Sequence, residues 1–172
     1  MTGIHLLSEQ MKSNFIYLDY NATTPVDQRA LNEMLPLFTT DYANPNGLHL
    51  FSLELQDRIE RATEEIAGAF HVSAKSIIFT SGATEAINLA IKGFQFSIKK
   101  HIVSIATEHK AVLETCTYME QLGFEVSYLE VDGEGMLDLN LLADTIRRDT
   151  VLVCVMLANN ETGVILPIKE IT

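Results

Sequence analysis

The stretch Phe79-Thr80-Ser81-Gly82-Ala83-Thr84-Glu85 sets the pattern that the rest of the chain follows. An apolar run, Ile77 to Phe79, leads into small and hydroxyl residues, and an apolar helical pattern follows that ends at Gly93. A strand that turns directly into a helix leaves free backbone N–H groups at the helix start, where the helix dipole favours an anion. Thr84 adds a hydroxyl donor. The stretch therefore predicts a phosphate cradle, although Ser and Gly at such a turn are also ordinary capping residues.

The composition is that of a globular protein with a single core. Apolar residues make up 47% and charged residues 20% of the 172 residues. The net charge of −11 makes nucleic acid and anionic membranes poor partners. Two cysteines give no disulfide framework and suit a reducing compartment, so we expect a cytoplasmic protein. Residues 1–14 lack the features of a secretory signal and are expected to form a poorly ordered leader.

Two helices and a loop are predicted before residue 70. A short strand-like run, 15–20, is followed by a helix that starts beyond Pro25 and carries Leu31, Met34, Leu35 and Phe38 on one face. Asn-Pro and Asn-Gly pairs mark 41–49 as a loop. A longer helix over 50–69 is expected to bury one face, formed by Leu55, Ile59, Ala62, Ile66 and Phe70.

From Ile77 onward strand patterns alternate with helix patterns. The predicted strands are 77–80, 101–106, 125–131 and 151–157, and the predicted helices are 83–92, 109–122 and 139–148. Strands joined through helices are parallel, with right-handed crossovers. The run VLVCVML at 151–157 has no polar alternation, so it should be covered on both faces. The sequence therefore predicts an α/β fold, a three-layer α/β/α domain with a mostly parallel sheet over residues 15–172.

Three polar clusters follow strands of this predicted sheet. They are Ser81 to Glu85, Thr107-Glu108-His109 and Asn159-Asn160-Glu161-Thr162-Gly163. Ligands of such sheets bind beyond the carboxyl ends of the strands, so one crevice could hold an anion cradle, an imidazole and a carboxamide. The third strand ends in Asp132-Gly133-Glu134-Gly135, which is typical of a turn.

Four stretches carry a likeness to a known family: Tyr17-Leu-Asp-Tyr-Asn-Ala-Thr-Thr-Pro25, Phe79 to Glu85 with Asn88-Leu-Ala-Ile91, Thr107-Glu-His-Lys-Ala-Val-Leu113, and Ala158-Asn-Asn-Glu-Thr-Gly163. In this order and spacing the chain resembles the amino-terminal half of cysteine desulfurases, which are pyridoxal-phosphate enzymes (fold type I) of the class V aminotransferase group. Any one of the four motifs would be weak evidence; together they are specific.

The resemblance implies roles for four residues toward pyridoxal 5'-phosphate. The backbone at Ala83 and Thr84, with the Thr84 hydroxyl, would hold the cofactor phosphate. His109 would stack on the pyridine ring and, as the catalytic residue, shuttle protons. Asn160 would hydrogen-bond the phenolic oxygen of the cofactor. The loop at 41–49 departs from the family pattern and contributes no predicted site residue.

The implied activity is desulfuration of L-cysteine to alanine, with the sulfur passing through an enzyme persulfide to iron–sulfur cluster or thio-cofactor assembly. The implied partners are the substrate L-cysteine, a complementary carboxy-terminal half or a second subunit of a homodimer, and a sulfur-acceptor scaffold protein. Nucleic acid and membranes are not expected partners.

The family keeps its Schiff-base lysine, the aspartate facing the pyridine nitrogen, the persulfide cysteine and the carboxylate-binding arginine in its later half, and none has a counterpart in this sequence. We therefore expect a fragment, or a chain that works with a complementary one. Because the family adds further strands after 151–157, the resemblance implies an incomplete PLP-dependent transferase-like large domain whose sheet has a bare edge and a bare apolar face. The chain alone should bind the cofactor weakly and be inactive. A related class V enzyme such as a selenocysteine lyase, and a non-catalytic module that docks on a partner chain, remain alternatives.

Several reactive residue types have ordinary structural explanations. Lys110 is adjacent to His109 at a helix start, so its side chain is expected to point outward rather than into the site. Cys116 shares a helix face with Val112 and Met119, and Cys154 lies in an apolar strand, so both are predicted to be inert core thiols. No group of His, Cys and Asp has the spacing of metal ligands, and no metal is predicted.

Overall fold

The computed structural model describes residues 16–172, so the predicted leader, residues 1–14, lies outside the described residues. The chain divides between Glu65 and Ile66 into two compact units, here called unit 1 and unit 2. The boundary falls inside the longest described helix, α3, Leu50–Ala69. The assignment of 15–172 to one cofactor domain stays a prediction.

Unit 1 consists of two helices and the predicted loop. Helix α2, Gln28–Thr39, begins where the Asp27 carboxylate accepts a hydrogen bond from the Arg29 N–H. The loop between α2 and α3 turns at Asn44, whose carbonyl accepts from the Gly47 N–H at 3.0 Å. Loop and helices agree with the sequence, but 16–20 forms no strand, because no described residue pairs with it.

The predicted buried face of α3 is wrong for most of its residues, and α2 does not bury its apolar face either. No residue of α2 is buried, and Phe38 is 72% exposed. Leu55 of α3 is buried, whereas Ile59 of α3 and Phe70, just beyond the helix, are exposed. A helix face is buried only where another layer packs on it, and the described residues of unit 1 supply no layer beyond these two helices.

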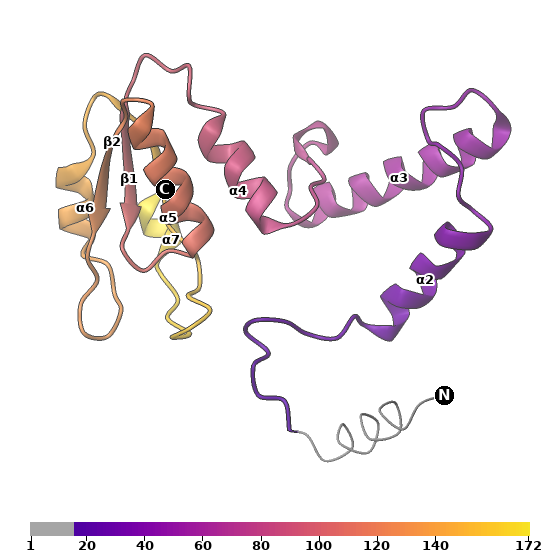
Figure 1. Ribbon diagram of the computed structural model, residues 1–172, viewed down its shortest axis with the longest axis horizontal. Coiled ribbons are helices and arrows are strands. Elements are labelled where there is room, and N and C mark those ends of the chain that lie inside the picture. The colour runs from indigo at the N-terminus through magenta and orange to yellow at the C-terminus, as the bar shows by residue number, and fades with distance from the viewer. Residues whose placement is uncertain (1–15) are drawn as a thin grey trace, which may run out of the picture. The chain divides into compact units, whose positions relative to one another are not determined.

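Unit 2 is an α/β sandwich around a parallel sheet (Figure 1). Its strands are β1, His101–Ile105, β2, Glu125–Leu129, and β3, Thr150–Cys154, in the order β2-β1-β3. Both pairings are parallel, as predicted. Its helices are the short 3-10 turn η1, Ala74–Ser76, then α4, Ala83–Lys92, α5, Lys110–Gln121, α6, Leu139–Thr145, and α7, Ile168–Ile171.

The predicted first strand, 77–80, is not part of this sheet. Ile77 has extended backbone, but Ile78 and Phe79 are exposed and pair with no described strand. An extended segment becomes a strand only when a neighbour takes up its N–H and C=O groups. The prediction of a strand at 77–80 is therefore wrong for the described structure.

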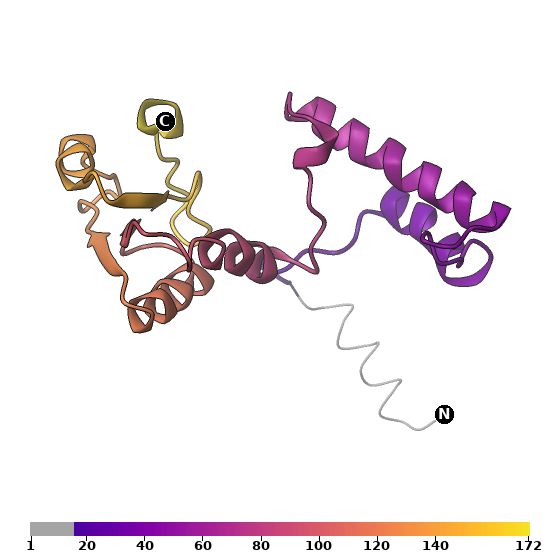
Figure 2. The ribbon, with the colours of Figure 1, turned by 90° about the horizontal axis from the view of Figure 1, so that it is seen from above.

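Two apolar clusters cover the two faces of the sheet and produce the predicted three layers. Ile102 packs with α4 and α5 in a cluster that includes Ile91, Val112, Cys116 and Met119. Val103 and Ile105 point to the opposite face, where they pack with α6 and the segment before α7 through Leu142 and Leu166. Figure 2 shows α4 and α5 on one side of the sheet and α6 and α7 on the other.

The central strand and the edge strand differ in burial. All five residues of β1 are buried, whereas every residue of β3 is half-buried. The expectation that 151–157 is covered on both faces is therefore wrong for the described structure, because β3 forms an edge of the sheet. Cys116 is fully buried as predicted, and Cys154 is half-buried.

Within residues 16–172 no helix combines the length and the apolar character that crossing a bilayer requires.

Candidate functional site

The first turn of α4 has no side-chain cap among the described residues. Gly82 occupies the capping position, and its carbonyl accepts the first helical hydrogen bond, from the Ala86 N–H at 3.1 Å. Ala83 and Thr84 follow and are exposed. The N–H groups of this turn therefore face outward at the positive end of the helix dipole, as an anion site requires.

Glu85 holds the turn in place rather than filling the anion site. Its Oε2 atom accepts hydrogen bonds from the Ser81 N–H at 2.7 Å and from the Ser81 hydroxyl at 2.6 Å. These two bonds hold the pKa of Glu85 below its usual range. From its motif alone Glu85 had no predicted role, and its contacts with Ser81 show how the turn is closed.

His109 caps the start of α5. Its Nδ1 atom accepts a hydrogen bond from the Ala111 N–H at 3.1 Å, so the neutral ring carries its proton on Nε2. The Lys110 side chain is 81% exposed, as predicted, and forms an ion pair with Glu114, although Lys110 also lines a hollow with His109. The imidazole is thus held by its own helix, with the Nε2–H side available for other contacts.

His109 shares a hollow with each of the two predicted phosphate-binding residues, Ala83 and Thr84. One hollow of about 420 Å³ is lined by Thr84, Asn88 and His109, together with residues of α5. A neighbouring hollow of about 390 Å³ is lined by Ala83, Glu108, His109 and Cys154 among others. Three of the four predicted site residues, Ala83, Thr84 and His109, therefore surround adjoining hollows between α4 and the start of α5.

Asn160, the fourth predicted site residue, lines neither hollow. Its side chain is exposed and donates to the Glu161 carboxylate at 3.0 Å. The preceding residue, Asn159, connects the loop after β3 with the loop after β1. Its Nδ2 atom donates to the Thr107 carbonyl at 3.0 Å, and its Oδ1 atom accepts from the Glu161 and Thr162 N–H groups. The loops after β1 and β3 thus meet, although through Asn159 rather than Asn160.

Glu108 is a site-lining residue that the sequence reasoning did not single out. It is only 9% exposed, and its Oε1 atom accepts a hydrogen bond from the Met156 N–H, just beyond β3. Burial raises the pKa of this carboxyl above its ordinary value. Its position directly before His109 was the only available signal, because the sequence does not reveal that a glutamate is buried.

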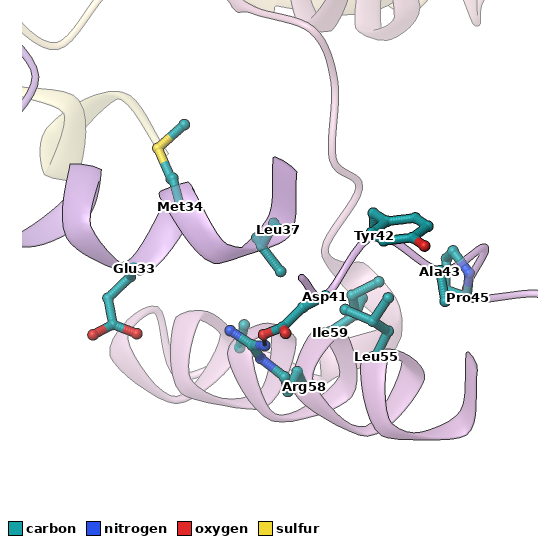
Figure 3. Close-up of a pocket in the computed structure, with 11 residues that line it drawn as sticks. Glu33, Met34, Leu37, Asp41, Tyr42, Ala43, Pro45, Leu55, Arg58 and Ile59 are labelled. Atoms are coloured by element: carbon teal, nitrogen blue, oxygen red, sulfur yellow. Dashed lines mark hydrogen bonds and ion pairs between the residues drawn. The ribbon is translucent and has the colours of Figure 1, made fainter. Parts of the chain in front are cut away.

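A larger hollow, of about 450 Å³, lies in unit 1 and contains no predicted site residue. Figure 3 shows Leu37 of α2 pointing toward Leu55 and Ile59 of α3, which also line this hollow. Its polar feature is the ion pair between Arg58 and Asp41, 2.7 Å apart, which holds the pKa of Asp41 below its usual range. The walls are otherwise mainly apolar, and nothing in this hollow resembles catalytic machinery.

Comparison with known proteins identifies the family. A family model described as aminotransferase class-V matches residues 16–172. The cysteine desulfurase IscS of Rickettsia bellii is 49% identical over 160 residues, which are 91% of this chain and 39% of that protein. The mitochondrial cysteine desulfurase of Candida albicans is 50% identical over 91% of this chain and 33% of its own length.

Two solved structures agree with the fold of this chain. A NifS-like protein is 41% identical, with a TM-score of 0.84 over 88% of this chain and 42% of that one. A structure titled SspA in complex with cysteine is 37% identical, with a TM-score of 0.87 over 91% of this chain and 46% of that one. The chain spans about 40% of the length of the bacterial relatives it matches. By its matched residues and its fold, the chain belongs to the class-V aminotransferase family.

Proposed function

We propose that the native gene product carrying this sequence is a pyridoxal-phosphate-dependent cysteine desulfurase. The observation that carries the proposal is the grouping of Ala83, Thr84 and His109 around adjoining hollows at the start of α4 and α5. The curated relatives named above are cysteine desulfurases, and one structural neighbour is titled as a complex with cysteine. L-cysteine is accordingly the proposed substrate.

The donor set at this site fits a phosphorylated pyridine cofactor. The uncapped first turn of α4 offers backbone N–H groups and the Thr84 hydroxyl to a phosphate. The imidazole of His109 lines the hollow beside Thr84 and offers a flat face for an aromatic ring. When bound, pyridoxal phosphate supplies an electron sink for bond cleavage in the substrate.

His109 is the proposed proton carrier of the site. The Ala111 N–H occupies its Nδ1 atom, so the neutral ring can donate a proton from Nε2 and take it back there. Asn160 is the proposed donor to the phenolic oxygen of the cofactor, a role for which its amide would exchange its contact with Glu161. A complementary polypeptide segment or second subunit, a sulfur-acceptor scaffold and a cytoplasmic location belong to the same proposal.

The test compares two asparagine variants of the native gene product, supplied with pyridoxal phosphate, L-cysteine and a thiol reductant. His109→Asn removes the imidazole but keeps a good helix-capping side chain, and kcat for alanine release should fall about 10²- to 10⁴-fold. The control His71→Asn changes an exposed histidine outside both hollows and should leave kcat unchanged. Wild-type protein that releases no alanine from cysteine, or a His109→Asn variant as active as the control, contradicts the proposal.

A further inference from the structure

A buried carboxylate, that of Glu108, lines a hollow with His109 and has no part in the chemistry proposed for the site. Glu108 accepts hydrogen bonds from two backbone N–H groups, those of Met156 and His109. It shares one hollow with His109 and Cys154. Among the described residues, no lysine or arginine forms an ion pair with it.

The charge of Glu108 works against folding. Burial raises its pKa above the ordinary value, so the ionised form is less favourable in the folded chain than in the unfolded one. Folding stability from this group is therefore present at low pH and is lost as the pH rises through the folded-state pKa. A glutamine could accept the same two backbone hydrogen bonds without carrying a charge. The hydrogen bonds alone thus do not explain why the residue is an acid.

We propose that Glu108 is a positioning residue for His109, which it holds against the end of β3 and whose protonated form it stabilises through its negative charge. The inference rests on the proposed function of the site. This positioning follows from the bond that Glu108 accepts from the Met156 N–H, because it joins the segment just beyond β3 to the residue before His109, the N-cap of α5. The charge effect follows from proximity: the two side chains attract when His109 is protonated, and burial weakens solvent screening of that attraction.

Other titratable groups near His109 are more exposed or already paired. They are Lys92 of α4, whose ammonium lies 4.3 Å from the centre of the Tyr118 ring, Lys110 and Glu114 of α5, which pair with each other, and Cys154 of β3. The interaction with the Cys116 thiol, together with burial, raises the pKa of the Cys154 thiol, so this group stays neutral. Glu108 is therefore the buried carboxylate in the hollow that His109 lines.

The test is an NMR titration of the isotope-labelled histidines in the cofactor-free native gene product, with His109→Asn identifying the signal of His109. In Glu108→Gln the titration midpoint of His109 should fall relative to wild type, because the buried negative charge is gone. The matched control is Glu114→Gln, which removes the same charge from an exposed side chain lining the other hollow with His109, and should shift the midpoint by less than half as much. An unchanged midpoint in Glu108→Gln, or equal shifts in the two variants, overturns the proposal.

Two further measurements separate this role from a purely structural one. Glu108→Gln should unfold at no lower urea concentration than wild type at pH 7, because the backbone bonds remain and the buried charge is gone. A variant that fails to fold overturns the proposal. The pH dependence of kcat should shift in the same direction as the NMR midpoint. Because the titration needs neither cofactor nor substrate, it can support or overturn the role of Glu108 even if cysteine is not the substrate.

Discussion

His101 is a buried histidine at the end of the sheet opposite the candidate site. Its Nδ1 atom lies 2.7 Å from the Thr150 hydroxyl and its Nε2 atom 2.9 Å from the Ser127 hydroxyl, so one ring joins all three strands. Burial lowers the pKa of His101 below its ordinary value. The folded chain therefore holds this ring neutral, and protonation weakens the fold.

A loss of stability at mildly acid pH follows from the neutral state of His101. The stability from this ring is present above the ordinary histidine pKa and is lost as the pH falls from about 7 toward 5. The free energy of unfolding, measured with urea across this range, should fall more steeply in wild type than in His101→Gln. The exposed-histidine control His71→Asn should keep the wild-type slope, and a His101→Gln variant with that slope would show that the ring is not the cause.

At the level of single residues, the sequence predicted which residues line the site better than it predicted their hydrogen-bond partners. Ala83, Thr84 and His109 were predicted from their motifs, and the structure groups them around adjoining hollows. Their roles stay a proposal. Glu108 and Asn159 were predicted only as members of polar clusters, because their individual contacts are hydrogen bonds to Met156 and Thr107, residues about fifty positions away in the chain. A local pattern does not report such long-range partners.

At the level of elements, helix α6 begins with a well-formed cap whose contribution can be measured. The Asp138 carboxylate accepts from the Asn140 N–H at 2.8 Å and from the Leu141 N–H at 3.3 Å. Asp138→Ala should lower the free energy of unfolding by about 1 kcal/mol, because both donors lose their partner. Asp144→Ala removes an equal charge from the exposed side of the same helix and should cost less than half of this in the same urea experiment. Equal losses would mean that charge, rather than capping, is responsible.

Elements with clear end signals were predicted most accurately. Helix α4 has the predicted bounds, because glycines flank it at Gly82 and Gly93, and α3 also matches residue for residue. Helix α6 ends earlier than expected, at Thr145, because Ile146 is extended and Arg147 reaches Glu125 and Asp149. The segment 77–80 was misassigned as a strand because pairing depends on a neighbour that the local pattern does not specify.

At the level of the whole molecule, the alternation of strands and helices predicted the parallel sheet and its three layers. It did not predict that β1 is the central strand and β3 an edge strand, because strand order depends on how the crossovers pack. The exposed faces of α2 and α3 show the same limit, since amphipathic spacing indicates which residues can be buried but not what covers them.

The most direct measurement is a crystal structure of the native gene product with pyridoxal phosphate bound. The phosphate should lie within hydrogen-bond distance of the first-turn N–H groups of α4 and of the Thr84 hydroxyl, with the pyridine ring against the imidazole of His109. A cofactor bound away from both helix starts, or a ring that makes no contact with His109, would contradict the account of this site.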